Sequence, residues 1–114
     1  MKAVFIELPP FARFRQDYLD DEAFRGLQAA LLRHPAAGNV IPGSGGLRKV
    51  RHGDSRRGQG KRGGLRVIYY WWEPGAQFWL FTLYDKNEAS DLTARERQIL
   101  KGLLDAELKA RGTP

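Results

Sequence analysis

The residues from Leu65 to Trp72 form the strongest strand pattern in the chain, and they constrain the fold more than any other segment. They read LRVIYYWW, which is rich in the β-branched and aromatic residues that favour strands. The next four residues, Glu73 to Ala76, place Pro and Gly at the central positions that a type II turn prefers. A second apolar segment, Phe78 to Tyr84, follows directly. Together the three segments predict an antiparallel hairpin.

Two helices are predicted upstream of the hairpin, after a first strand from Ala3 to Leu8. The first helix is short and amphipathic, and the second begins at an aspartate that can cap its N-terminus, Asp20 or Asp21. The second helix is expected to end near His34, because Pro35 disfavours helical geometry in the residue before it. The apolar residues at helical spacing are Phe11, Phe14, Tyr18 and Leu19 in the first helix and Phe24, Leu27 and Leu31 in the second.

A third helix is predicted downstream of the hairpin. Thr93 and Glu96 fit the capping-box pattern of a helix start, and Gly112 suits its end. Residues 36–46 are dense in Gly, Pro, Asn and Ser and predict a loop, which leads into a short strand from Leu47 to Arg51. The apolar stripe of the third helix, which we expect in the core, consists of Ile99, Leu100, Leu103, Leu104 and Leu108.

The expected element order is therefore β-α-α-β-β-β-α. A chain of 114 residues is too short for two independent cores, so residues 1–114 are predicted to form a single domain. Its class is α+β, an antiparallel sheet with helices packed on one face.

The positive charge is concentrated in one segment. The chain carries +6, but the stretch from Leu47 to Arg66 alone carries +7, from eight basic residues and one acid, Asp54. Residues 52–64 hold much of this charge among several glycines and predict a mobile loop. A basic excess confined to one segment is typical of a phosphate-binding surface.

Other classes of site and location are disfavoured. The chain has no cysteine, which excludes a disulfide scaffold and a thiolate zinc site, and its two histidines could not build a closed metal site without several carboxylates. We therefore expect neither a structural metal nor a cofactor. The apolar run at residues 1–7 is too short for a signal peptide or a membrane span, so a cytoplasmic protein without membrane contact is expected.

Several segments together resemble the HigB branch of the RelE/ParE toxin superfamily. They are Gly46–Arg51, Gly60–Gly64, Leu65–Tyr70, Leu83–Glu88 and Asp91–Thr93. The resemblance covers nearly the whole chain, and it implies a RelE-like fold. It also implies the toxin of a type II toxin–antitoxin system, a ribosome-dependent endoribonuclease (mRNA interferase) that inhibits translation. The implied partners are a HigA-like helix-turn-helix antitoxin, the ribosome with its RNA, and mRNA.

The resemblance also implies which residues act. Catalysis in RelE-like proteins is attributed to basic residues on the central strands, which correspond to Lys49 and Arg51 and to Arg66. Lys86 falls near a later basic position, and Tyr84 is the nearest candidate for an aromatic hydroxyl. Further RNA contacts are expected from Arg48, Arg56, Arg57, Lys61 and Arg62.

These residue types suit metal-free RNA cleavage, in which the ribose 2′-hydroxyl attacks the adjacent phosphate. Arginine stays protonated and matches phosphate oxygens with two parallel hydrogen bonds, so Arg66 suits charge stabilisation. A general base is also needed, and both Lys49 and His52 are candidates. Arg66 shares a strand face with apolar residues, so its stem is expected to be partly buried.

Two other functions and several structural roles stay open at this point. The chain could be a ParE-like, non-nucleolytic inhibitor of DNA gyrase, or a nucleic-acid-binding module without catalysis. Lys49 and Arg51 could instead be edge charges that discourage aggregation, and Lys86 could simply lie on the turn before the last helix. The sequence also leaves codon preference, antitoxin docking, stoichiometry and retention of activity open.

Overall fold

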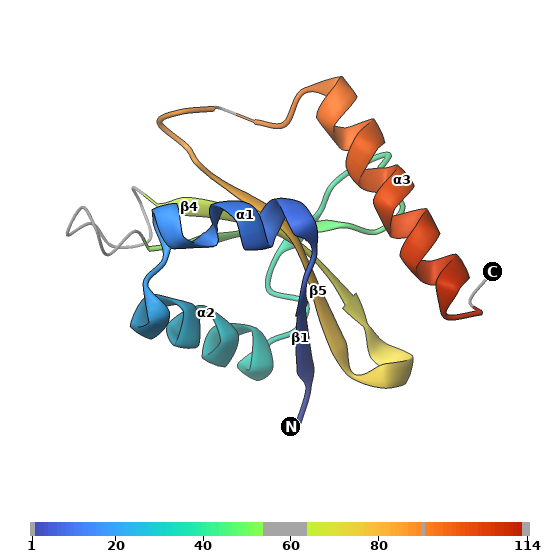
Figure 1. Ribbon diagram of the computed structural model, residues 1–114, viewed down its shortest axis with the longest axis horizontal. Coiled ribbons are helices and arrows are strands. Elements are labelled where there is room, and N and C mark those ends of the chain that lie inside the picture. Colours follow the sequence, from blue (N-terminus) through green and yellow to red (C-terminus); the bar gives the residue numbers. More distant parts are fainter. Residues whose placement is uncertain (1, 54–63, 90, 113–114) are drawn as a thin grey trace.

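The computed structural model describes residues 2–53, 64–89 and 91–112 (Figure 1). It confirms the α+β class and every predicted helix and strand, and it adds β2, a two-residue strand in the segment predicted as loop. The elements in chain order are β1 (Val4–Glu7), α1 (Pro9–Tyr18), α2 (Asp21–Arg33), β2 (Asn39–Val40), β3 (Arg48–His52), β4 (Leu65–Trp72), the 3-10 turn η3 (Glu73–Gly75), β5 (Gln77–Asp85) and α3 (Ala94–Ala110).

Local signals fix the helix ends. The Asp20 carboxylate accepts a hydrogen bond from the N–H of Ala23 at 2.8 Å and caps α2. Thr93 and Glu96 form both bonds of the predicted capping box at α3, at 3.1 and 2.8 Å. Gly112 follows α3 with a φ of 73°, a left-handed conformation that glycine adopts without strain.

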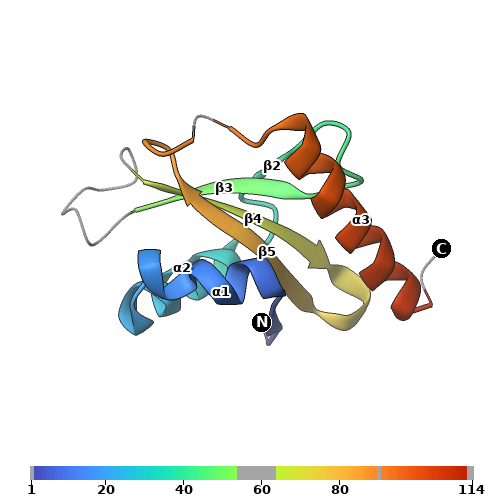
Figure 2. The same cartoon turned by 45° about the horizontal axis from the view of Figure 1, so that its top comes forward.

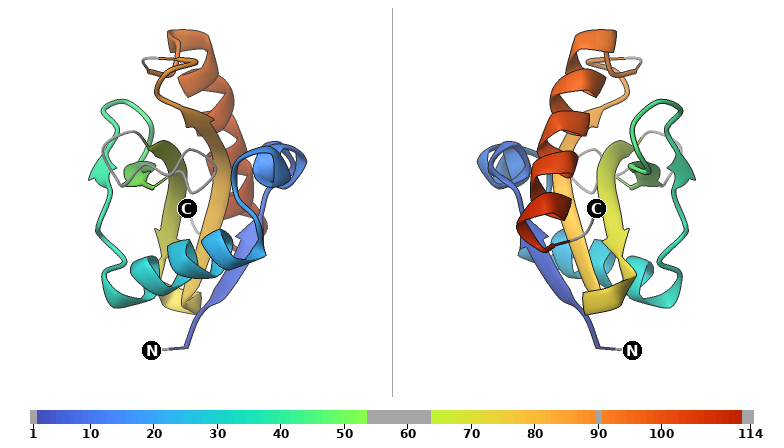
Figure 3. Two further views of the ribbon diagram at one scale, coloured as in Figure 1. Left: turned by 90° about the vertical axis from the view of Figure 1, so that its left-hand side faces the viewer. Right: turned by 90° about the vertical axis from the view of Figure 1, so that its right-hand side faces the viewer.

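The five strands form one sheet in the order β1-β5-β4-β3-β2, which Figure 3 shows with β2 and β3 on one side and β1 with α1 on the other. The β2–β3, β3–β4 and β4–β5 pairs are antiparallel, but β1 runs parallel to β5. The prediction of an entirely antiparallel sheet is therefore wrong at this edge. All the other elements except α3 separate β1 from β5, so no local turn sets their relative direction.

Helices cover both faces of the sheet, which corrects the prediction that they lie on one face (Figure 2). The physical reason lies in β4, whose alternate residues are apolar on both faces and therefore need cover on both. On the α1/α2 side the buried core consists of Phe11, Leu19, Leu27, Leu31, Leu65, Val67, Tyr69, Phe78, Leu80 and Leu83. On the α3 side it consists of Leu8, Leu47, Ile68, Trp79, Phe81, Leu92, Leu100 and Leu104.

Two smaller predictions also differ from the structure. The residues predicted as a type II turn form η3 instead, and Ala76, not Gly75, adopts the left-handed conformation, with a φ of 51°. Gly75 is needed for space, because a Cβ there would lie 2.2 Å from the Trp72 ring. Ile99, predicted in the core, is 53% exposed. Within the described residues, none of the helices combines the length and apolarity that crossing a membrane requires.

Candidate functional site

Strand register brings three of the predicted site residues into one row across the sheet. Arg51 of β3 pairs with Arg66 of β4, and Arg66 pairs in turn with Tyr84 of β5. Paired residues point to the same face of a sheet, and so do residues two positions apart on one strand. Lys49, which pairs with Ile68, therefore shares this face, and Ile68 lies in the α3-side core. We call Lys49, Arg51, Arg66 and Tyr84 the cationic row.

Arg66 has a fixed place at the centre of this row. Its side chain is half-buried, as the sequence predicted, and its face continues along β4 into Ile68 and Tyr70 of the α3-side core. The guanidinium Nη1 donates to the carbonyl oxygens of Gly64 and Leu65 at 3.2 and 3.4 Å. An arginine held in this way presents its remaining donors in a defined direction, which suits an anion.

An acidic residue that the sequence did not single out completes the site. The Asp91 carboxylate oxygen Oδ1 lies 3.3 Å from the Lys49 Nζ and 3.5 Å from the Tyr84 hydroxyl. The same oxygen accepts a hydrogen bond from the N–H of Leu92 at 2.7 Å. Asp91 comes from the segment between β5 and α3, so one atom links this segment to β3 and β5.

The charges around Tyr84 keep its hydroxyl protonated. Burial, followed by the charge of the Asp91 carboxylate, raises the pKa of Tyr84 to about 12, whereas the Arg66 guanidinium acts in the opposite direction. The hydrogen bond from Leu92 lowers the pKa of Asp91; desolvation opposes this, and Lys49 lowers it further. At neutral pH the site therefore combines an ionised carboxylate with a neutral phenol.

Two hollows open beside Lys49. One, of about 380 Å³, is lined by Ala37, Asn39, Lys49, Val50, Arg51 and Arg66. The other, of about 460 Å³, is lined by Asn39, Val40, Ile41, Pro42, Lys49, Asp91 and Arg97. They share Asn39 and Lys49, so cationic groups from β3, β4 and α3 face two adjoining open spaces. This arrangement suits an extended polyanion better than a small enclosed ligand.

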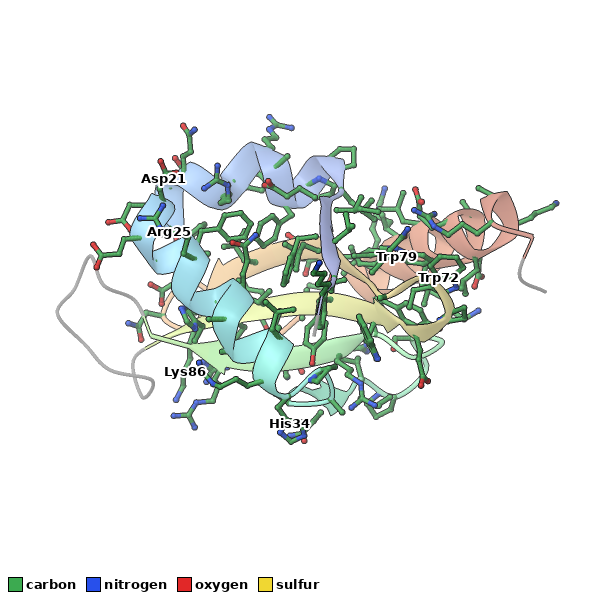
Figure 4. The ribbon with its side chains drawn as sticks, turned by 90° about the horizontal axis from the view of Figure 1, so that it is seen from below. Asp21, Arg25, His34, Trp72, Trp79 and Lys86 are labelled. Carbon is green, nitrogen blue, oxygen red and sulfur yellow. The ribbon has the colours of Figure 1, made fainter. Side chains whose placement is uncertain are left out.

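The other predicted residues do not lie in the row. His52 pairs with Leu65, and Arg48 pairs with Tyr69, so register places both on the α1/α2 side. Arg48 donates to the carbonyl of Gly38 at 2.8 Å, which is a structural role. Lys86 is exposed and follows β5, at the opposite end of the molecule from Trp72 and Trp79 (Figure 4). His52, predicted at the start of the loop, is the last residue of β3, and residues 54–63 of the predicted loop, with the RNA-binding candidates Arg56, Arg57, Lys61 and Arg62, lie outside the described residues.

The described side chains suit charge stabilisation and proton donation. In the described ranges, no group of three or more His, Cys, Asp or Glu side chains is placed to hold a metal ion. The cationic row instead offers three cations and one protonated hydroxyl on a single face, which matches the needs of a phosphodiester.

Comparison with known proteins identifies the fold. No family model matches the sequence. Among solved structures, the chain is similar to the E. coli toxin RelE, solved as a double arginine-to-alanine mutant in the free state, with a TM-score of 0.54 and 12% sequence identity. The similarity covers 79% of this chain and 90% of the RelE chain. The chain therefore has a RelE-type toxin fold.

Proposed function

We propose that this protein is the toxin of a type II toxin–antitoxin pair and a metal-independent endoribonuclease that cleaves mRNA on the ribosome. The observation that carries the proposal is the cationic row, in which Arg66 lies between Arg51 and Tyr84 on an open face. The RelE-type fold supports the same reading. A non-catalytic nucleic-acid-binding module would need the cations but would have no use for a phenol whose proton is retained beside them.

The reaction is an attack of the ribose 2′-oxygen on the adjacent phosphorus. A bond forms between the 2′-oxygen and phosphorus, the bond from phosphorus to the 5′-oxygen breaks, and a cyclic phosphate and a 5′-hydroxyl result. The 2′-oxygen loses one proton to water, and the leaving 5′-oxygen gains one. Arg66 and Arg51 stabilise the negative charge that builds up on the phosphorane, because both stay protonated. Tyr84 donates the proton that the leaving 5′-oxygen takes up.

Neither of the two general bases suggested by the sequence, Lys49 and His52, is placed to take the proton of the 2′-hydroxyl. Lys49 forms an ion pair with Asp91, which only its ammonium form can make, and His52 lies on the other face of the sheet. Such a site depends on external alignment of the 2′-oxygen, since orientation alone can contribute on the order of 7–11 kcal/mol to a rate. The proposed source of this alignment is the ribosome, which a basic surface can approach through ribosomal RNA.

The proposed partners and location follow from this activity. Ribosomes and translated mRNA place the protein in the cytoplasm. A cognate antitoxin, proposed to be a HigA-like helix-turn-helix protein, would silence it by covering the cationic row or by blocking ribosome entry. The first mode predicts an acidic contact segment and an affinity that falls as salt rises.

Growth arrest and primer extension on a defined mRNA test the proposal. Arg66→Ala should remove both growth arrest and cleavage without unfolding the domain, with a rate loss of about 10²–10³-fold for one charge-stabilising donor. Arg25→Ala is the matched control, because Arg25 is an exposed arginine of α2 (Figure 4), and α2 packs on the face of the sheet opposite the row. A folded Arg66→Ala protein that is as toxic as the wild type refutes the assignment. Growth arrest without mRNA cleavage would instead indicate a gyrase-inhibitor type of toxin.

A further inference from the structure

The Asp91 carboxylate is an unexpected group in a site proposed to bind a phosphate. It is 57% exposed and lies 3.3 Å from Lys49, so it places a negative charge where RNA must bring another. An exposed ion pair of this kind contributes little to folding stability. Its side-chain contacts with β3 and β5 are both made with residues of the cationic row, Lys49 and Tyr84.

We infer that Asp91 is a positioning residue, which holds the Lys49 ammonium and the Tyr84 hydroxyl at fixed points beside Arg66. Its negative charge weakens RNA binding as a consequence. The inference rests on the proposed ribonuclease function. It assigns Lys49 the part of a fixed cation and Tyr84 that of a proton donor.

The geometry around the carboxylate supports this role. Asp91 Oδ1 is itself fixed, because it accepts the 2.7 Å hydrogen bond from Leu92 directly before the capped start of α3. A lysine on a strand has many rotamers, and contact with a fixed anion selects among them. Lys49 lines both hollows, so the position of its side chain affects the opening between them.

The charges around Tyr84 also support a positioning role for Asp91. The ionisable groups that act on its hydroxyl are Asp91, Arg66 and Glu96. Arg66 favours loss of the proton, and Asp91 opposes that loss most strongly of the two carboxylates. Removing the charge of Asp91 therefore lowers the pKa of Tyr84. Removing a carboxylate that does not act on the Tyr84 hydroxyl would leave this pKa unchanged.

Asp91→Asn separates these effects, because asparagine keeps an oxygen that can accept from Leu92 and loses only the charge. We expect the variant to bind a non-cleavable 2′-O-methyl RNA about fivefold more tightly, since one negative charge is removed from the phosphate site. On ribosome-bound mRNA, kcat should fall about tenfold to a hundredfold, because Lys49 and Tyr84 lose their fixed positions. Binding and turnover thus change in opposite directions.

Three comparisons complete the test. Asp105→Asn removes an exposed acid of α3 that pairs with Lys101, so it matches the change in net charge and should leave both quantities unchanged. Asp91→Glu restores the charge but moves it by one methylene, so RNA affinity should return to the wild-type value while kcat stays low. In a Lys49→Ala, Tyr84→Phe background, Asp91→Asn should have little further effect on kcat.

The titration of Tyr84, followed by NMR of 13C-labelled tyrosine in the free protein, tests the inference without any cleavage assay. It should shift to lower pH in Asp91→Asn and remain in place in Asp105→Asn. An unshifted titration overturns the inference, as does an Asp91→Asn protein that loses affinity, turnover and thermal stability together. If Asp91→Asn still lowers kcat fully in the Lys49→Ala, Tyr84→Phe background, Asp91 acts on the RNA directly, and the positioning role is wrong. If the wild type cleaves no mRNA, the proposed function fails, and the titration and RNA affinity still decide whether Asp91 organises these groups.

Discussion

Replacing Tyr69 with phenylalanine should destabilise the protein by about 2–3 kcal/mol. Tyr69 is fully buried in the α1/α2-side core, and its hydroxyl makes two hydrogen bonds. It donates to the carbonyl of Pro35 at 2.7 Å and accepts from the N–H of Gly38 at 3.0 Å. These bonds fasten the connection between α2 and β2 to the centre of the sheet.

The magnitude follows from what the variant leaves behind. A net hydrogen bond contributes about 1 kcal/mol, and a buried donor left without a partner costs about 1–3 kcal/mol. The Gly38 N–H is buried and becomes such a donor, while the Pro35 carbonyl is only half-buried and can recover part of its loss from water. The sum is about 2–3 kcal/mol, which lowers the Tm of a domain of this size by roughly 8–12 °C.

Urea unfolding followed by circular dichroism measures this change, and calorimetry gives the Tm. Tyr70→Phe on the same strand is the control, because within the described part of the chain the Tyr70 hydroxyl has no hydrogen bond, so its loss should cost less than about 0.5 kcal/mol. A Tyr69→Phe protein within about 0.5 kcal/mol of the wild type would refute the reasoning.

Three further predictions concern other parts of the molecule. Because the pKa of Tyr84 is about 12 in the folded chain against an ordinary 10.0, its contribution to stability is present below pH 10 and is lost as pH rises toward 12. Tyr84→Phe should therefore make the alkaline fall in unfolding free energy shallower in urea titrations, and an equal fall in both proteins would contradict this. Arg111→Ala should lower the free energy of unfolding by about 1–2 kcal/mol and alter tryptophan fluorescence, because the Arg111 guanidinium lies 4.2 Å from the Trp79 ring centroid and forms an ion pair with Glu107. Unchanged emission would argue against this contact. Thr93→Ala should cost about 1 kcal/mol in urea unfolding through loss of the capping box with Glu96, and a change below 0.3 kcal/mol would mean that the cap contributes nothing.

The features that the sequence predicted correctly are those set by neighbouring residues. Asp20 and Thr93 cap their helices through bonds that reach only three residues along the chain. β4 was predicted with its observed bounds, because eight strand-forming residues lie between two turn-forming segments. Period-two alternation then placed Arg66 on the same face as the apolar residues that follow it.

The features that it missed depend on contacts between distant segments. β1 pairs with β5 across most of the chain, so its parallel direction has no local signal. Asp91 and Lys49 are 42 residues apart, and nothing in either segment predicts that they meet. Two features could already be predicted from alternation along the strands. The apolar residues on both faces of β4 require helices on both faces, and a strand that extends to residue 52 places His52 on the opposite face from Lys49 and Arg51.

The most direct test of the central claim compares cleavage of one transcript, naked and in a translating complex, at equal protein concentration. An active site that stabilises charge, and in which neither Lys49 nor His52 is a ready base, should cleave ribosome-bound mRNA well and naked RNA poorly. Arg66→Ala should lose the ribosome-dependent cleavage, and Arg25→Ala should retain it. Equal wild-type rates on the two substrates would mean that the site is complete without the ribosome, and the account of Lys49, Arg51, Arg66 and Tyr84 as charge stabilisers and a proton donor would then be wrong.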